Sequence, residues 1–452
     1  MNIHFIGIGG IGVSALAQYY LEKRETITGS DLKDSEIINL LREKGAKIFI
    51  GEHKSDNLPE NTDLVIYSPA IQKNNPELKK ALALQVSSYK LQVLSYPQAL
   101  GKLTKKHFTI AVSGTHGKST TSSMLALILI KAGLDPTVII GTKLKEFDDS
   151  NFRAGKSKYL LIEADEWQAS FLNYYPQIII LTNIEKEHLD YYKNLNHILR
   201  TYKEYISHLP KEGILIINGK DKNIKKLIFN FQFPIFNFQK EEPKDKKTLK
   251  KILKVPGEHN IENALAALET ARILGISDDI SFSALSDYQG AWRRFEESNH
   301  SFKNHKLQTI NYKLISDYAH HPTEILATLK AARGKFKNEK IWLVFQPHQY
   351  QRVFHLLLKF VSTFQKIKDM GLADKIIITD IFDVSGREDE KIKKKINSKK
   401  LVRKIKNNSI IYLEKENLIS QLKEELKNKK IDVLIMMGAG DIYELTKKLS
   451  PI

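Results

Sequence analysis

A glycine-rich loop between a buried strand and a helix restricts the fold of this chain more than any other feature. The strand is expected over residues 108–112 and the helix over residues 119–132, with the loop Gly114-Thr115-His116-Gly117-Lys118-Ser119-Thr120 between them. Such an arrangement binds nucleotide phosphates, because glycines let backbone N–H groups approach the oxygens and the helix N-terminus attracts the anion. The sequence therefore predicts a parallel α/β domain that binds ATP.

The polar residues of this phosphate loop have expected tasks. Lys118 would contact the β and γ phosphates, and the hydroxyl of Ser119 would coordinate Mg²⁺. The common pattern of such loops starts with a glycine where this chain has Val112, so the loop is a shortened form. The other residues expected around the phosphates are Gly114, Thr115, His116, Gly117 and Thr120.

Two further predicted strands lead into residues that can bind metal. Residues 159–162 precede Glu163, and residues 178–183 precede His188. Ligands of open α/β sheets bind at the carboxyl ends of the strands, so these residues can converge with the phosphate loop. Taken singly, Glu163 could be a solvated acid and His188 a turn residue. Together they predict two Mg²⁺ ions, with Ser119, Glu163 and His188 as ligands, since a carboxylate suits Mg²⁺ and an imidazole could hold a second ion.

A second glycine turn follows the first predicted strand, residues 3–6. It reads Gly7-Ile8-Gly9-Gly10-Ile11-Gly12, and Asp31 ends the next strand nineteen residues further on. These residues fit a dinucleotide-binding domain, so an NAD-dependent dehydrogenase is one interpretation. That interpretation gives no account of the phosphate loop, and another nucleoside diphosphate could use the same turn.

Length, charge and composition limit the class of protein. The 452 residues suggest two or three domains, and repeated strand and helix patterns indicate α/β folds throughout. The net charge of +18 would suit a nucleic-acid-stimulated ATPase, but the lysines are scattered, which favours an anionic substrate. There is no cysteine, no signal peptide pattern and no apolar run long enough for a membrane span. We expect a cytoplasmic protein that binds neither nucleic acid nor membranes.

The motifs together resemble those of the Mur ligases of peptidoglycan synthesis, over essentially the whole chain. The residues that carry the resemblance are 7–12, 114–120, 163–166, 183–190, 257–264, 293–295, 317–324 and 346–348. The resemblance implies a Rossmann-like domain over residues 1–102 that binds the UDP part of a substrate. It also implies a central P-loop domain with a parallel sheet over 103–296 that binds ATP, and a Rossmann-like domain over 297–452 that brings the amino acid.

The resemblance also assigns residues to the substrates. The residues implied to lie near the UDP-linked substrate are Gly9, Gly10, Gly12, Ser30, Asp31, Ser68 and His116. Those implied to hold ATP, besides the phosphate loop, are Asn260, Asn263, Arg294 and Asp317, of which Arg294 reaches the transferred phosphate. The residues implied on the amino-acid side are His320, His348 and Arg352. The residues expected to act in catalysis are Lys118, Glu163, His188 and Arg294.

Within the family, Gln346-Pro347-His348 favours the branch that adds L-alanine to UDP-N-acetylmuramate through an acyl phosphate. The alternative is a recycling ligase that attaches a preformed tripeptide to the same sugar nucleotide. The chain departs from the alanine-adding branch at Gln349, where arginine is usual, and at Trp167-Gln168, where a small and an acidic residue are usual. Lys203 lies where some relatives carry a carbamylated lysine, but we expect an exposed helix lysine. The pattern leaves open a monomer or a homodimer.

Overall fold

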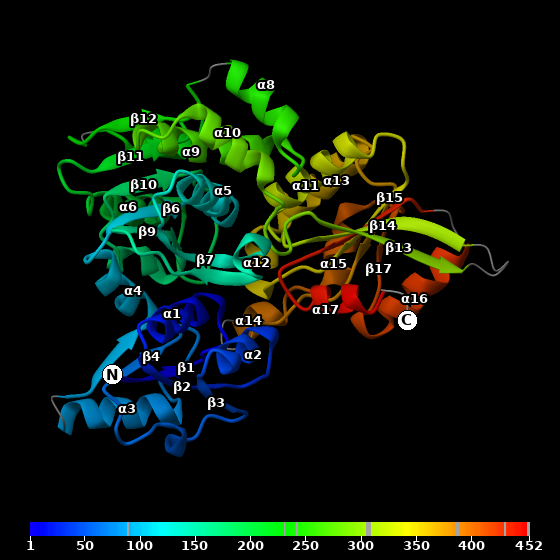
Figure 1. Ribbon diagram of the computed structural model, residues 1–452. Coiled ribbons are helices and arrows are strands. Elements are labelled where there is room, and N and C mark those ends of the chain that lie inside the picture. The colour runs from blue at the N-terminus through cyan, green and yellow to red at the C-terminus, as the bar shows by residue number, and fades with distance from the viewer. Residues whose placement is uncertain are drawn as a thin grey trace. The chain divides into compact units, whose positions relative to one another are not determined.

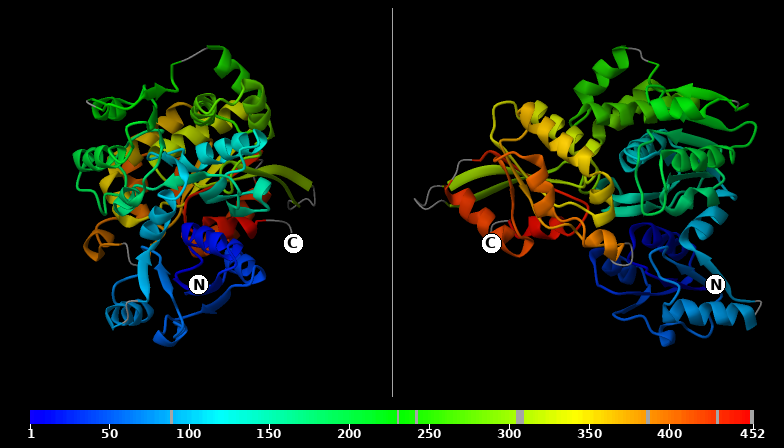
Figure 2. Two further views of the ribbon diagram at one scale, coloured as in Figure 1. Left: turned by 60° about the vertical axis from the view of Figure 1, so that its left-hand side comes forward. Right: turned by 180° about the vertical axis from the view of Figure 1, so that it is seen from behind.

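The computed structural model describes residues 1–87, 90–229, 231–240, 243–303, 309–384, 388–428 and 431–449. Its strands form three sheets that follow one another along the chain (Figure 1). Figure 2 shows the same ribbon in two further views. The chain divides into two compact units. The first unit comprises Met1–Glu185, Leu195–Ile252 and Glu262–Tyr288, and the second comprises Lys186–Asn194, Leu253–Ile261 and Gln289–Ile452.

The first sheet has five parallel strands in the order β3-β2-β1-β4-β5. Its elements are β1 (Asn2–Ile6), α1 (Ile11–Glu22), β2 (Thr26–Asp31), α2 (Glu36–Glu43), β3 (Lys47–Ile50), β4 (Leu64–Tyr67), α3 (Pro76–Ser87), β5 (Gln92–Ser95) and α4 (Tyr96–Thr104). Helices α1 and α3 lie on opposite sides of the sheet (Figure 1). Because β1 lies between β2 and β4, the glycine turn after β1 opens where the strand order reverses, which is where such sheets bind ligands.

The second sheet has seven strands in the order β12-β11-β10-β6-β9-β7-β8. Its strands are β6 (Phe108–Ser113), β7 (Thr137–Leu144), β8 (Ser150–Arg153), β9 (Tyr159–Ala164), β10 (Ile178–Leu181), β11 (Ile214–Ile217) and β12 (Ile235–Asn237). The helices around it are α5 (Lys118–Lys131), α6 (Leu195–Ile206), α7 (Lys222–Leu227), α8 (Pro243–Ile252), α9 (Glu258–Ile273) and α10 (Asp278–Asp287). Strands β9 and β10 flank β6, so their carboxyl ends lie beside the start of the phosphate loop.

The third sheet has six strands in the order β13-β14-β18-β15-β16-β17. Its strands are β13 (Glu296–Lys303), β14 (Thr309–Asp317), β15 (Ile341–Phe345), β16 (Lys375–Ile378), β17 (Ile410–Tyr412) and β18 (Val433–Met437). Its helices are α11 (Pro322–Lys335), α12 (Tyr350–His355), α13 (Leu357–Asp369), α14 (Glu390–Lys393), α15 (Ser398–Ile405), α16 (Lys415–Asn428) and α17 (Ile442–Lys447). Alternate residues of β15 pack into two separate apolar clusters, as expected for a strand buried on both faces.

The predicted fold class, three consecutive α/β sheets with mostly parallel strands, is confirmed. The polar composition of residues 240–250 suggests a loop or an insertion, but residues 243–250 lie in helix α8. The helix is stabilised where Leu249 is fully buried and Asp245 bonds Arg272 at 2.8 Å. A single apolar position among lysines gives too weak a periodicity to predict a helix. Among the described residues, no helix is both long enough and apolar enough to cross a membrane.

Candidate active site

The first glycine turn is packed against the ends of β2 and β4. The backbone N–H groups of Gly7 and Ile8 both donate to the carbonyl of Ser30, at 2.9 and 3.1 Å. Gly7 has a φ of +78°, and a Cβ built on it would come within 3.0 Å of the Cβ of Ser68. The turn therefore needs glycine at its start, and it lies beside two of the residues that the resemblance implied for the UDP-linked substrate.

Two later glycines of the turn also contact specific side chains. The N–H group of Gly9 donates to Oδ2 of Asp31 at 2.8 Å, so this carboxylate holds the turn from the end of β2. A Cβ on Gly12 would lie 2.7 Å from Cζ of Tyr96, the first residue of α4. Tyr96 was not predicted as a site residue, because a tyrosine at the start of a helix belongs to no recognisable motif. The contacts of Gly9, Gly10 and Gly12 with a diphosphate stay a prediction.

The side chain of Ser30 points into a buried polar cluster. Its hydroxyl donates to Oε2 of Glu77 at 2.6 Å, and His4 and His53 contact the same carboxylate at 3.0 and 3.1 Å. Asn57 donates to Glu77 Oε1 at 2.7 Å. Burial alone would raise the pKa of Glu77, but these hydrogen bonds outweigh it and lower the pKa below its usual range. The cluster holds β1, β2 and α3 together, and no sequence pattern indicated it.

Residues at the end of β10 hold the phosphate loop in place. The N–H groups of Thr115 and His116 donate to the backbone carbonyl and the side-chain oxygen of Asn183, at 3.0 and 2.9 Å. The hydroxyl of Thr182 donates to the carbonyl of His116 at 2.6 Å. A Cβ on Gly114 would overlap this hydroxyl, so only glycine fits at this position of the loop. Thr182 and Asn183 were not among the predicted site residues.

Gly117 lies where the phosphate loop enters α5. It has a φ of +84°, and a Cβ there would overlap the side-chain oxygen of Asn263 on α9. The same oxygen accepts a hydrogen bond from the hydroxyl of Thr121 at 3.3 Å. The structure therefore brings Asn263, one of the predicted ATP-binding residues, against the loop.

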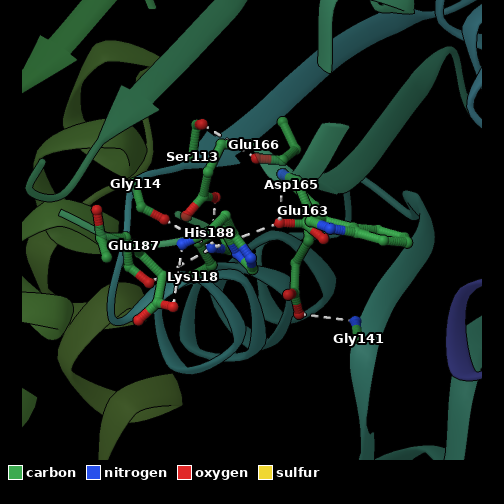
Figure 3. A network of polar contacts seen from close by, with 12 residues as sticks. Ser113, Gly114, Lys118, Gly141, Glu163, Asp165, Glu166, Glu187 and His188 are labelled. Atoms are coloured by element: carbon green, nitrogen blue, oxygen red, sulfur yellow. Dashed lines mark hydrogen bonds and ion pairs between the residues drawn. The ribbon is translucent and has the colours of Figure 1, made fainter. Parts of the chain in front are cut away.

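Lys118 is bound by carboxylates within the first unit. Its Nζ donates to Oε2 of Glu166 at 2.8 Å and to the carbonyl of Gly114 at 2.7 Å, and Asp165 lies 4.0 Å away (Figure 3). Burial would lower the pKa of Lys118, but Glu166 and Asp165 outweigh it and raise the pKa above the usual lysine range. Lys118 is therefore held as a cation by these carboxylates, and its contact with phosphate stays a prediction. Glu166 was quoted within a motif, but it was not among the predicted site residues.

Ser119 and Glu163 form an oxygen-rich pair beside the loop. The hydroxyl of Ser119 donates to Oε2 of Glu163 at 3.1 Å. The other oxygen, Oε1, accepts from the backbone N–H of Gly141 on β7 at 2.7 Å (Figure 3). Glu163 lies within β9 and not after it, next to Val112 of β6. A hydroxyl and a carboxylate oriented in this way fit a hard cation such as Mg²⁺.

The second unit carries Arg294 and Asp317 on adjacent segments. The guanidinium of Arg294 lies over the ring of Tyr318, 4.9 Å from its centroid. Asp317 is buried at the end of β14 and accepts hydrogen bonds from the N–H groups of Phe295 and Ala319, at 2.8 and 2.9 Å. Burial raises the pKa of Asp317. The carboxylate thus fixes the segment that carries Arg294, and its contact with the ATP ribose stays a prediction.

The three residues predicted for the amino-acid side also lie in the second unit. Nε of Arg352 donates to Oε1 of Glu187 at 2.9 Å, and its Nη1 donates to Nδ1 of His348 at 3.0 Å. The rings of His348 and His320 are 5.8 Å apart. Burial lowers the pKa of His320 to about 4, so its ring is neutral at neutral pH. The structure thus brings His320, His348 and Arg352 together around Glu187, which the prediction did not include.

The remaining predicted residues have defined local settings. His188 belongs to the second unit. It has a φ of +53°, and its N–H donates to Oε1 of Glu187 at 3.1 Å. Asn260 is buried in the first turn of α9 and donates to the carbonyl of Pro256 at 2.7 Å. Lys203 is exposed on α6, as expected. The metal contact of His188 stays a prediction.

Comparison with known proteins gives matches along the whole chain. Three family profiles match in order: "Mur ligase family, catalytic domain" over residues 2–108, "Mur ligase middle domain" over 112–271 and "Mur ligase, glutamate ligase domain" over 304–440. The UDP-N-acetylmuramate–L-alanine ligase of Acetivibrio thermocellus is 39% identical over 98% of this chain and 94% of its own length. That of Clostridium kluyveri is 37% identical over 98% and 96%.

The chain belongs to the Mur ligase family. This membership accounts for both glycine-rich turns, whereas the dehydrogenase interpretation accounted for only one.

Solved structures of Mur ligases share this fold. The crystal structure of UDP-N-acetylmuramate-alanine ligase from Thermotoga maritima superposes with a TM-score of 0.76 at 27% identity, over 99% of this chain and 98% of that one. A murein peptide ligase from Psychrobacter arcticus superposes with a TM-score of 0.71 over the same shares of the two chains. Its 23% identity shows the shared fold alone. The Mur ligase described here thus shares its fold with both of these solved structures.

Proposed function

We propose that this Mur ligase joins L-alanine to UDP-N-acetylmuramate in the cytoplasm, with ATP converted to ADP and phosphate, as a step of peptidoglycan synthesis. The observation that carries the proposal is that one compact unit holds both glycine turns, with Lys118 and the Ser119–Glu163 pair at the second. Full-length relatives at 37% and 39% identity, named as UDP-N-acetylmuramate–L-alanine ligases, support the choice of substrates.

The chemistry follows from the poor reactivity of a carboxylate toward amines, since an oxide cannot leave. A carboxylate oxygen of the UDP-linked substrate attacks the γ phosphorus of ATP, and ADP departs with the electrons of the broken P–O bond. The resulting acyl phosphate is attacked at its carbonyl carbon by the amine of L-alanine. Inorganic phosphate leaves, the amine loses a proton and an amide remains. No protein nucleophile is required.

The residues of the chain would supply charge and position. Phosphoryl transfer depends mainly on neutralising negative charge and aligning the reacting groups. Lys118 would exchange its bond to Glu166 for the β and γ phosphates, and Arg294 would contact the transferred phosphate. The N-terminus of α5 adds its backbone N–H groups.

Magnesium would neutralise phosphate charge and hold the oxygens in line when bound. Ser119 and Glu163 offer the oxygen ligands for one ion, and their 3.1 Å contact supports this assignment. His188 offers a nitrogen ligand for a second ion, and the proposal of two ions depends on this residue.

The remaining contacts follow the same scheme. The contact of Asn263 with Gly117 supports a place for Asn263 beside ATP, with Asn260 three residues earlier on α9. On the amino-acid side, Arg352 would bind the carboxylate of L-alanine with His348 and His320 beside it. Because Arg352 already bonds Glu187, the incoming carboxylate would have to share or displace that contact.

The proposal is tested by measuring phosphate release from ATP with UDP-N-acetylmuramate and one of four amines: L-alanine, glycine, L-serine or the tripeptide. The mass of the product identifies the amide formed. We expect turnover that needs both the sugar nucleotide and L-alanine. Preference for the tripeptide would reassign the chain to the recycling ligases, and turnover without any need for the sugar nucleotide would refute the proposal as a whole.

A further inference from the structure

A buried polar cluster joins α1 to the strand β8 of the second sheet. Its members are Ser14 and Gln18 on α1 and Ser150 and Asn151 on β8, and the exposed fraction of each is 6% or less. This α1–β8 cluster lies entirely within the first compact unit. None of these residues was predicted from the sequence to have a role.

The hydrogen bonds of the cluster are complementary. The amide nitrogen of Asn151 donates both to the carbonyl of Ile11 and to the hydroxyl of Ser14, the latter at 3.0 Å. Its amide oxygen accepts from Nε2 of Gln18 at 2.9 Å, and Oε1 of Gln18 accepts from the hydroxyl of Ser150 at 3.0 Å. Each amide therefore has partners for both of its ends.

Burying these polar side chains costs desolvation free energy, which apolar side chains at the contact between α1 and β8 would not cost. Their use indicates that the register of α1 on β8 is important. A buried amide that loses its partner costs far more than an apolar contact would, so the hydrogen bonds permit only one register of α1 on β8. The register concerns the glycine turn directly, because Ile11 is both the fifth residue of that turn and the first residue of α1. Asn151 thus holds the carbonyl of the turn itself.

Strands β7 and β8 form a hairpin, and this hairpin also contacts Glu163 beside the phosphate loop. Strand β7 pairs with β8, and the N–H group of its Gly141 donates to Glu163 at 2.7 Å. A Cβ on Gly141 would lie 2.9 Å from the other carboxylate oxygen, so the strand passes close against Glu163. One hairpin therefore touches the glycine turn through Asn151 and the predicted metal ligand through Gly141.

We propose that Asn151 is a positioning residue that fixes the glycine turn, and with it the diphosphate of the UDP-linked substrate, relative to Glu163 and the phosphate loop. Gln18 orients the Asn151 amide so that its nitrogen faces Ile11. The inference rests on the proposed function, because it assumes that the turn binds a UDP-linked carboxylate which must meet ATP.

The test compares Asn151→Ala and Asn151→Asp with the wild-type chain, measuring kcat, the KM for each substrate and the Tm. Asn151→Asp keeps the size and the oxygen that accepts from Gln18 but cannot donate to Ile11. We expect both variants to raise the KM for UDP-N-acetylmuramate by about tenfold and to lower kcat, while the KM for ATP stays within about twofold. The control is Lys143→Ala, which removes the 3.0 Å ion pair of β7 with Glu36 outside the cluster and should leave kcat and every KM unchanged.

A merely structural role predicts a lower Tm with unchanged constants, and that result would overturn the inference. A rise in the KM for ATP in place of the sugar nucleotide would also overturn it. If the Asn151 variants do not fold, Gln18→Ala should show a smaller rise in the same KM, and no rise would count against the inference. Wild-type protein without turnover on the sugar nucleotide would instead refute the proposed function.

Discussion

In the proposed function, Lys118 would contact the phosphates of ATP only by leaving the carboxylate of Glu166. Glu166 is almost fully buried and bonds the ammonium at 2.8 Å, so the triphosphate must replace one strong charge contact by another. The contact with Glu166 would keep the lysine charged and oriented before ATP binds. The contact also explains why a lysine can be partly buried here, because a cation removed from water without a partner would be unstable.

Replacing Lys118 should impair the phosphate loop without changing the first glycine turn. We expect Lys118→Ala to lower ligation by at least about a thousandfold, because the transferred phosphate loses its main cation. Binding of UDP-N-acetylmuramate should persist, since the first turn is unchanged. Lys131→Ala is a matched control on the same helix, where Lys131 pairs with Asp287 at the surface. Ligation that survives in Lys118→Ala would remove the phosphate loop from the mechanism.

The predicted role of Glu163 as a metal ligand can be tested through the Mg²⁺ dependence of turnover. Glu163→Ala removes the partner of Ser119 and Gly141, so the affinity for Mg²⁺ should fall. We expect a strong loss of turnover at low Mg²⁺ that high Mg²⁺ partly restores, measured as phosphate release across a Mg²⁺ titration. A Mg²⁺ dependence equal to that of the wild type would show that Glu163 is not a ligand.

Glu77 makes the stability of the first sheet depend on pH. Its folded pKa lies below the ordinary value of 4.5, because hydrogen bonds from His4, His53, Ser30 and Asn57 outweigh burial. A carboxyl with a lowered folded pKa stabilises the fold fully above the ordinary pKa, and this contribution is lost as the pH falls below it. We expect Glu77→Gln to cost about 2–4 kcal/mol at pH 7.

The difference between Glu77→Gln and the wild type should shrink as the pH falls from about 5 to 3, in urea unfolding followed by circular dichroism. A difference that stays constant over this range would show that Glu77 does not carry its charge into the folded state.

At the scale of single elements, helix α5 begins under a steric restriction. Gly117 combines a positive φ with contact to Asn263. Gly133, just after the same helix, has a φ of +76°, but a Cβ added there would meet no atom within 4 Å. The two glycines therefore share a backbone conformation that would strain an alanine, but they differ in the space around them. Alanine substitutions at these two positions therefore distinguish the effect of backbone strain from the effect of the contact with Asn263.

We expect Gly133→Ala to lower stability by about 1 kcal/mol without changing the kinetic constants. Gly117→Ala should cost a similar strain and also raise the KM for ATP by about tenfold or more, because Asn263 must move. Steady-state kinetics together with thermal unfolding measure both effects. Equal KM values for ATP in the two variants would show that the contact with Asn263 does not matter for nucleotide binding.

The elements themselves were predicted unevenly. Strands such as β9, expected over residues 159–162, and the strand before the phosphate loop were predicted because continuous apolar runs mark buried parallel strands. The hairpin β7–β8 was missed, although it holds both Gly141 and Asn151. Its strand β8 contains Ser150, Asn151 and Arg153, whose polarity gives no alternating pattern.

At the scale of the whole molecule, the net charge of +18 has to be reconciled with a small anionic substrate. Many lysines pair with nearby acids, as in Lys313–Glu297, Lys375–Glu425 and Lys399–Glu414. Pairing leaves the excess of 18 positive charges in place, and the scattered lysines lead us to expect this excess to be spread out and not gathered into one basic surface for a polyanion.

We therefore expect phosphate release to be indifferent to DNA and RNA at about 0.15 M salt, where the Debye length is about 8 Å. The measurement is turnover with and without nucleic acid, with and without UDP-N-acetylmuramate. Severalfold stimulation by nucleic acid in the absence of the sugar nucleotide would favour the nucleic-acid-stimulated ATPase that the charge alone also allowed.

Local pattern was enough to determine the family, the fold class and the positions of the two glycine-rich turns. Glycines at fixed spacing after a buried strand leave few conformations open, so their meaning can be inferred without neighbours. Side chains that act through distant partners could not be found in this way. The bond of Glu166 to Lys118, the contact of Tyr96 with Gly12 and the hold of Asn151 on Ile11 exist only because the sheets bring separate segments together. Each is a contact between residues far apart in the chain, and the tertiary structure alone decides such contacts.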